Sequence, residues 1–299
     1  MNKAKVGVVG KGRILAEAGF VVMWSSGFIG ASLGTLTAGT STLLAWRFLI
    51  AAIILFGWTM AMRRRWPSAG GFVHAGIVGL LSQGVYLGGV VGAVEMGVSA
   101  GTTALVAALQ PLLAASLAGP VLGEKVTGRQ WIGLAIGLAG VALVVGGDMG
   151  MVGAAPMWAY ALPFAGMAGL VAATFVERVS DGRAASDMPL DVSLTIQCSV
   201  SAVVFGVVAL AQGSLAPPED TRFWGAVLWL VVLSNFGGYG FYWLNVKLSS
   251  VTRVSSLLYL TPPTTMAWAF VMFGEEVGYL AILGLAICAC GVFLANKSE

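Results

Sequence analysis

The stretch TTALVAALQPLLAASLAGPVLGEKVTGRQWIGLAIGLAGVALVV, residues 102–145, has a second copy further along the chain, RVSSLLYLTPPTTMAWAFVMFGEEVGYLAILGLAICACGVFLAN, residues 253–296. The two copies align without a gap at one offset of 151 residues (253 − 102). The identities at this offset are Pro111 with Pro262, Gly123-Glu124 with Gly274-Glu275, Gly133 with Gly284, and Gly140-Val141 with Gly291-Val292. Matches of proline and glycine at a single offset indicate an internal repeat.

The composition of the chain is that of a protein whose main solvent is lipid. Of its 299 residues 58% are hydrophobic and only 10% are charged, with a mean hydropathy of +0.90, whereas soluble domains carry about 25% charged residues. The 42 glycines lie among Ala, Leu and Val, which favours close helix contacts in a bilayer over flexible linkers. A net charge of +3, without basic patches interleaved with aromatic residues, argues against a nucleic-acid partner.

Apolar runs of about 18 to 23 residues, long enough to cross a hydrocarbon core of about 30 Å as helices, recur along the chain. They lie at residues 14–34, 41–62, 72–93, 98–119 and 129–147, and again at 157–177, 190–212, 223–246, 251–273 and 277–296. The runs lack the alternation of barrel strands. We therefore predict an all-α polytopic membrane protein of ten transmembrane helices. One five-helix repeat covers residues 1–147 and the other covers residues 148–299. The basic start and apolar run of residues 1–34 could form a signal peptide, but nine further runs favour a retained first helix.

Lys and Arg residues predict the orientation, because short loops that carry them stay on the cytoplasmic side. With a cytoplasmic N-terminus, only Arg222 falls outside and Arg47 falls within a span; on the cytoplasmic side are Lys3, Lys5, Lys11, Arg13, Arg63, Arg64, Arg65, Lys125, Arg129, Arg178, Arg183, Lys247, Arg253 and Lys297. Both termini are therefore predicted to be cytoplasmic. With an odd number of spans in each half, the second half is inverted, an arrangement that supports alternating access.

Several short segments resemble those of a known family. They are Trp24-Ser25-Ser26-Gly27-Phe28, Arg47-Phe48, Gln110-Pro111, Leu122-Gly123-Glu124, Gly133 and Gly140-Val141. In this order, and with the second copy, they resemble the ten-helix EamA-type exporters of the drug/metabolite transporter superfamily, and most of all the bacterial aromatic amino acid exporters. The resemblance implies export of neutral or aromatic amino acids and related metabolites across the bacterial inner membrane, with some flat drug-like cations as a further class of cargo.

Candidate substrate-binding residues are polar or aromatic groups near the middle of spans, where such groups are costly unless they face a partner or a cavity. Asn235, Tyr239 and Tyr242 stand at i, i+4 and i+7, one face of an α-helix. Gln83 and Tyr86 stand at i and i+3, and the resemblance implies that this mid-helix position faces a central cavity. Both sets could instead bond neighbouring helices. Trp24 is either a packing residue or an aromatic wall for a ligand ring.

Pro111 and Pro262 occupy equivalent places in the fourth and ninth spans. Each removes a backbone donor and frees a carbonyl one turn earlier, so both spans are expected to bend. The bends could be static. Their occurrence in both repeats favours a hinge, or a place where freed carbonyls face a cavity.

Apart from residues at the cytoplasmic ends of spans, Arg47 is the only Lys or Arg inside a predicted span. We expect it near the outer end of its helix, with its charge extended toward the lipid headgroups and a structural role. In the alternative, the Arg47-Phe48 pair holds a carboxylate substrate during release. The acidic residues fall at span ends or in loops, and this pattern favours neutral or zwitterionic cargo over obligatory cations.

Other kinds of protein fit the chain less well. It lacks an HExxH motif, a Cys-His pair and a P-loop ending in GK[ST], so we expect no enzyme activity, no metal and no cofactor. Rings of charge typical of channels are not evident. The serious alternative is another cargo, such as drugs or nucleobases. Ten spans can enclose a pathway in one chain, so we expect a functional monomer that contacts membrane lipids and a small-molecule substrate.

Overall fold

The computed structural model describes residues 3–123, 126–150, 155–180, 188–248, 257–275 and 277–296, and all regular structure in these ranges is helical. The elements of the first half are α1 (Lys3–Thr35), α2 (Thr40–Ala61), α3 (Ala69–Gly79), η1 (Leu80–Val85), α4 (Tyr86–Glu95), α5 (Ala100–Ala108), α6 (Gln110–Leu122) and α7 (Gly128–Met149). Those of the second half are η2 (Met157–Tyr160), α8 (Ala161–Ser180), α9 (Leu190–Ala211), α10 (Thr221–Trp229), η3 (Leu230–Gly238), α11 (Tyr239–Leu248), η4 (Leu258–Leu260), α13 (Thr261–Phe273) and α14 (Tyr279–Asn296).

Eight helical stretches of the described residues are long and apolar enough to cross a membrane. They correspond to the first eight predicted spans and merge α3 with η1 and α4, α5 with α6, and α10 with η3 and α11. The apolar part of α14, Tyr279–Ala295, is shorter, and α13 has 13 residues. Residues 251–256 of the predicted ninth span lie outside the described residues. The all-helical class is therefore confirmed for the described chain.

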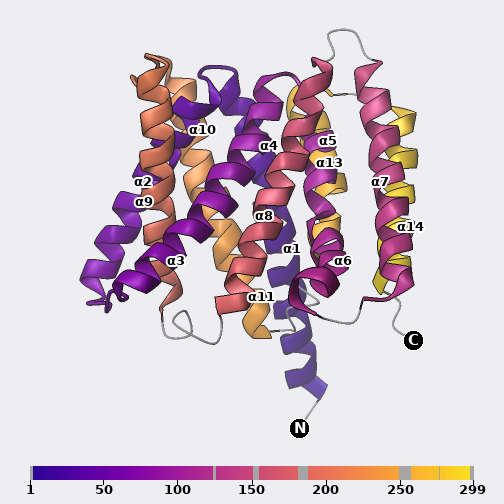
Figure 1. The fold of residues 1–299 in the computed structure, drawn as a ribbon, viewed down its shortest axis with the longest axis horizontal. Coiled ribbons are helices and arrows are strands. Elements are labelled where there is room, and N and C mark those ends of the chain that lie inside the picture. The colour runs from indigo at the N-terminus through magenta and orange to yellow at the C-terminus, as the bar shows by residue number, and fades with distance from the viewer. Residues whose placement is uncertain are drawn as a thin grey trace.

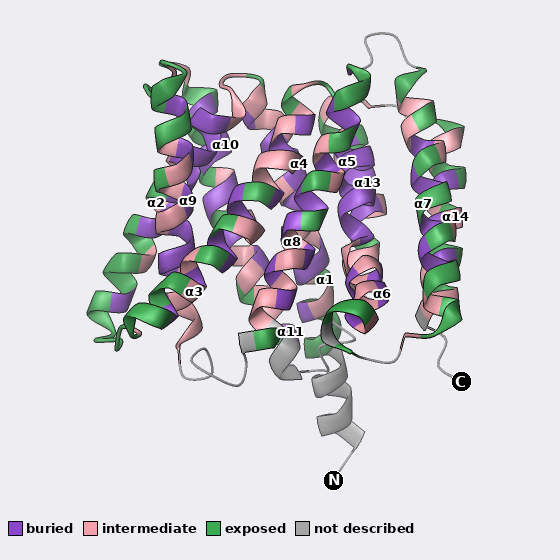
Figure 2. Ribbon diagram, viewed as in Figure 1, coloured by how far each residue is buried: buried purple, intermediate pink, exposed green. Residues whose placement is uncertain are grey.

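The described helices form one bundle in which α1 begins and α14 ends at the same end (Figure 1). Buried residues gather where helices face one another, while the outward turns of α2, α7 and α14 are exposed (Figure 2). Exposed side chains on these turns include Ile53, Ile132 and Phe293. Large apolar side chains on the outside are expected of a surface that faces lipid tails.

Helices at equivalent places in the repeat pack against each other. Helices α2 and α9 run antiparallel: Ser41 Oγ near the start of α2 donates to Gln212 Oε1 just past the end of α9, and Trp58 Nε1 near the end of α2 donates to Asp191 Oδ2 at the start of α9. The rings of Phe48 and Phe205 stack between them with centroids 6.1 Å apart.

Helices α7 and α14 repeat this arrangement on the opposite side of the bundle (Figure 1). A Cβ added to Gly133 would lie 2.5 Å from the Gly291 carbonyl oxygen, and one added to Gly140 would lie 2.6 Å from that of Gly284. Larger residues at these positions would force the two backbones apart. Cys288 Sγ donates to the carbonyl of Gly137 at 3.2 Å, and these two residues are themselves equivalent at the offset of 151 (288 − 137). A pseudo-two-fold axis therefore passes between them.

The matching prolines stand where helices are interrupted. Helix α5 stops at Ala108 and α6 starts at Gln110, so Pro111 occupies the first turn of α6, where its missing N–H is tolerated. In the second half, η4 precedes α13, and Pro262 occupies the first turn of α13. A left-handed glycine follows the last residue of both α6 and α13, Gly123 at φ 72° and Gly274 at φ 68°, a conformation that other residues adopt at a cost.

Two π-helical segments, η1 and η3, also stand at equivalent places, since adding 151 to residues 80–85 gives 231–236, inside η3. In a π-helix the backbone bonds run from i to i+5, which shifts every later side chain relative to an α-helix. Such segments occur frequently at functional sites. Both segments reach the central part of the bundle described next.

Candidate functional site

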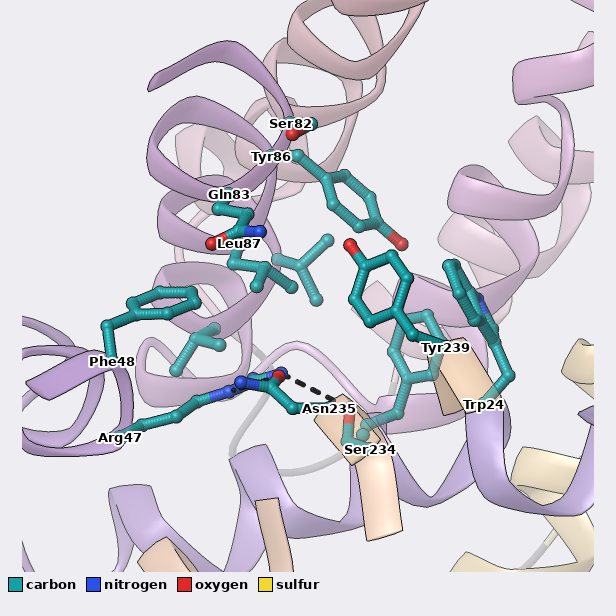
Figure 3. Close-up of a pocket in the computed structure, with 14 residues that line it drawn as sticks. Trp24, Arg47, Phe48, Ser82, Gln83, Tyr86, Leu87, Ser234, Asn235 and Tyr239 are labelled. Carbon is teal, nitrogen blue, oxygen red and sulfur yellow. Dashed lines mark hydrogen bonds between the residues drawn. The ribbon is translucent and has the colours of Figure 1, made fainter. Parts of the chain in front are cut away.

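A small pocket of about 50 Å³ lies where α1, α2, η1 with α4, and η3 with α11 meet (Figure 3). It is lined by Trp24, Gly27, Phe28, Arg47, Phe48, Ser82, Gln83, Tyr86, Leu87, Val90, Val91, Ser234, Asn235 and Tyr239. We call it the central pocket. A cavity of about 390 Å³ between α2, α9 and η3 with α11, the side cavity, shares Asn235 and Tyr239 with it. The two spaces meet at these two side chains.

Five of the predicted substrate-binding residues line the central pocket: Trp24, Gln83, Tyr86, Asn235 and Tyr239. The rings of Trp24 and Tyr239 meet edge to face with centroids 5.8 Å apart. In Figure 3 these two rings and that of Tyr86 lie on one side of the pocket, while Arg47 and Asn235 lie on the other. The pocket thus has an aromatic wall and a polar wall. Substrate binding by these residues stays a prediction.

Tyr242 does not line the central pocket. Its ring packs on Phe20 of α1, with centroids 5.9 Å apart, in an apolar cluster that also includes Val21. The strict α-helical spacing that placed Tyr242 on one face with Asn235 does not apply, because Asn235 and the next three residues belong to the π-helical segment η3.

Arg47 is also placed differently from the prediction. Only 3% of it is exposed, and its side chain points into the central pocket (Figure 3) rather than toward lipid headgroups. Arg47 Nε donates to Asn235 Oδ1 at 3.2 Å, and Nη2 donates to Ser234 Oγ at 3.2 Å and also to Asn235 Oδ1. The prediction of a headgroup-facing charge was therefore wrong. Acceptors on η3 hold the guanidinium inside the bundle, which compensates part of its cost of burial.

Ser234 was missed as a pocket residue. A signal was available in the repeat, because Ser234 is the equivalent of Gln83 at the offset of 151 (234 − 83). Gln83 Nε2 donates to Gln197 Oε1 at 3.2 Å, and Gln197 Nε2 donates to Ser193 Oγ at 3.0 Å. This chain of amides fixes one wall of the pocket to α9.

A third space, the end cavity, measures about 580 Å³ and lies where α5 begins, α7 ends and α14 begins. Asp148 and Glu275 both line it. Burial, together with the Asp148 carboxylate, raises the pKa of Glu275 above its ordinary value. Among the described residues, no group of three or more His, Cys, Asp or Glu side chains could hold a metal ion.

Comparison with protein families accounts for nearly the whole chain. The model of the EamA-like transporter family matches twice, at residues 11–146 and at residues 147–297. The chain belongs to the EamA-like transporter family. It is a multi-pass transporter of the inner membrane, with two EamA repeats in one polypeptide.

Several curated relatives of this EamA chain are named as transporters or exporters. A probable terminal-alkyne amino-acid exporter of Streptantibioticus cattleyicolor is 26% identical, covering 93% of this chain and 91% of the relative. The inner membrane transporter YedA of Escherichia coli K12, itself uncharacterised, is 22% identical over 93% of this chain and 88% of its own. An uncharacterised transporter of Synechocystis is 23% identical over 85% and 80% of the two chains.

A solved crystal structure has the same fold. It matches with a TM-score of 0.62 and 22% sequence identity, and the match covers 96% of both chains. At this identity the likeness concerns the arrangement of helices alone.

Proposed function

We propose that this EamA protein is a secondary transporter that exports small metabolites, above all neutral and aromatic amino acids, by alternating access through the central pocket. The observation that carries the proposal is the pocket's two-sided lining. The aromatic rings of Trp24, Tyr86 and Tyr239 line one side, and Arg47 and Asn235 line the other. A solute with an apolar ring and a polar end matches such a lining.

In the proposed architecture ten transmembrane helices form two inverted five-helix halves, residues 1–147 and 148–299, with both termini cytoplasmic. The antiparallel packing of α2 on α9 and of α7 on α14 supports inversion, because each pair joins equivalent helices of the two halves. The start of α1 and the end of α14 lie at the same end of the bundle, which supports an even number of spans. The segregation of Lys and Arg supports the cytoplasmic assignment of that end.

Transport requires the central pocket to expand. A volume of about 50 Å³ holds little more than one water molecule's share of liquid volume, about 30 Å³, and ligand pockets are typically about 300–1,000 Å³. The described conformation is therefore one in which the pocket is contracted between the side cavity and the end cavity. The interruptions at Pro111 and Pro262 are the proposed hinges, since bending there needs no backbone bond to break. The lining of the central pocket comes from one chain, which supports a functional monomer.

The alternative is an exporter of drug-like molecules or other small metabolites, such as nucleobases or flat organic cations. The aromatic wall suits a flat molecule of any charge. Arg47 disfavours cations, because a positive charge in the pocket would face another at short range. A channel or a membrane enzyme has less support, since the relatives are named as transporters.

The first experiment measures flux of radiolabelled phenylalanine, tryptophan and threonine in liposomes that contain the purified protein, with and without a pH gradient. We expect flux of the two aromatic amino acids to exceed that of threonine, and to fall at least about tenfold in Tyr239→Ala and Gln83→Ala as pocket contacts worth 1.4 kcal/mol or more are lost. Phe293→Ala, on the exposed outer face, is the control and should transport normally. Folded protein that moves no amino acid would contradict the proposal and favour the drug or metabolite alternative.

A further inference from the structure

The central pocket contains a positive charge and no negative one. Arg47 is the only charged residue among the lining residues. Ion pairs of the described residues join Arg13 to Glu17, Arg64 to Asp191 and Arg222 to Asp220. Arg47 takes part in none of these pairs. A buried charge without a counterion is costly, and an intramembrane one that persists commonly marks a substrate pathway.

The partners that Arg47 does have are neutral and leave part of its guanidinium free. Of its five N–H donors, the one on Nε and the two on Nη2 account for the bonds to Asn235 and Ser234. Among the described residues, no acceptor bonds the two donors of Nη1. A carboxylate is the group whose two oxygens match a guanidinium edge, and such charge-assisted bonds are about twice as strong as neutral ones.

Two acceptors with no partner stand elsewhere in the same pocket. The Ser82 hydroxyl and Gln83 Oε1 are buried atoms that make no hydrogen bond to any described residue, and only 2% of Gln83 is exposed. Buried acceptors without a partner are rare in folded proteins. Here they suit an N–H donor of a bound solute, while the aromatic wall suits its ring.

From this arrangement we propose that Arg47, held by Ser234 and Asn235, is the binding site for the carboxylate of the transported solute. The carboxylate is then the group that the pocket requires. The amine donates hydrogen bonds to Gln83 and Ser82 and contributes less to the binding free energy. Cargo is therefore an organic monocarboxylate with an apolar or aromatic body, and amines that lack a carboxylate are excluded. This inference rests on the proposed function only in taking the central pocket as the transport site.

The first test uses the wild-type protein and needs no transport. Its thermal unfolding midpoint in detergent is measured with equal concentrations of phenylalanine, N-acetylphenylalanine, 3-phenylpropionate, phenylalaninamide and phenylalaninol. A compound that binds the folded state raises the midpoint. We expect the three carboxylates to stabilise the protein. We also expect the amide and the alcohol to bind at least about tenfold more weakly, as loss of a hydrogen bond to a charged group implies.

The second test supplies the missing anion from the protein itself. Asn235→Asp places a carboxylate on Arg47, so the empty protein should be at least as stable as wild type, while stabilisation by the three carboxylates should disappear. Arg47→Met should lose the preference for carboxylates over the amide and alcohol. The same change at Arg222, which is 80% exposed in an ion pair at the start of α10, should leave the preference intact.

Three results would overturn the inference: equal stabilisation by phenylalanine and its amide, no stabilisation by any carboxylate, or an unchanged preference in Asn235→Asp. The analogue series and Asn235→Asp decide the matter even if Arg47→Met does not fold. Failure here is distinct from failure of the proposed function. Phenylalanine flux without a carboxylate preference would remove only the role of Arg47, whereas carboxylate binding without flux of any solute would remove only the transport assignment.

Discussion

The central pocket and the end cavity differ in size and in the sign of their charge. The central pocket is about 50 Å³ and is lined by one arginine without a carboxylate. The end cavity is about 580 Å³ and is lined by Asp148 and Glu275 without a lysine or arginine. In the proposed topology the end cavity faces outward. Among the described residues that line the end cavity, no lysine or arginine could bind an anionic group a second time on its way out.

This difference shows how two cavities of one bundle can have separate tasks. The central polar groups are held by side chains from other helices, Arg47 of α2 by η3 and Gln83 of η1 by α9. By contrast, the Asp148 carboxylate accepts a backbone bond, from Ser99 N at 3.3 Å. In the proposed function, selection of cargo is therefore a task of the central pocket, whereas the raised pKa of Glu275 makes the charge of the end cavity depend on pH.

The largest effect is expected from Gly27→Ala, which disturbs the central pocket without touching its charge. A Cβ at this position would lie 2.7 Å from Ser234 Oγ, so the serine must rotate away from Arg47. Loss of a hydrogen bond to a charged group costs about 1.5–3 kcal/mol, and phenylalanine flux should fall about tenfold or more. Gly57→Ala, where no other atom lies within 4 Å, is the control. Equal flux in the two variants would mean that Ser234 does not position Arg47.

An intermediate effect is expected from Glu275→Gln, which removes a charge from the end cavity. Because the pKa of Glu275 is raised above its ordinary value of about 4.5, the folded state holds this proton more tightly than the unfolded state. Wild-type stability should therefore decline as pH rises from about 4.5 through the raised pKa. Unfolding midpoints measured across this range should decline less in Glu275→Gln. Identical pH profiles would show that Glu275 titrates as it does in the unfolded chain.

The smallest effect is expected at the side cavity, from Asp191→Asn. The Asp191 carboxylate accepts Arg64 Nε at 2.7 Å and Trp58 Nε1 at 3.2 Å, but the Arg64 side chain is 43% exposed. Such a pair contributes about 0.2–1 kcal/mol, and about 1 M salt should screen most of it. Thermal unfolding midpoints of wild type and variant, compared at low and high salt, measure this contribution. The matched control is Asp220→Asn, which removes the exposed pair of Asp220 with Arg222. A salt-independent loss of stability would indicate a buried contact instead.

Hydropathy and the repeat predicted the helical class and the positions of eight spans, because lipid burial imposes length and apolar composition on each span separately. They also pointed to five residues of the central pocket, since mid-span polar groups are few. Tyr242 and Arg47 could not be placed in the same way. The π-helical turns of η3 change which residues share a face, and Arg47 faces inward because of acceptors on a helix some 190 residues away in sequence (235 − 47). Neither the π-helical backbone of η3 nor the contact of Arg47 with η3 can be predicted from the residues next to Tyr242 or Arg47 in sequence.

The contact of α7 with α14 is self-complementary. Gly133 contacts Gly291, and Gly140 contacts Gly284. Because Gly284 is the equivalent of Gly133 and Gly291 that of Gly140, exchanging the two repeats turns one contact into the other. Gly137 contacts its own equivalent, Cys288. This is the geometry of an isologous dimer interface, in which one patch binds a second copy of itself. A separate five-helix chain with this surface could make the same contact with an antiparallel twin. The chain is in this sense a dimer of its two repeats joined by a peptide link.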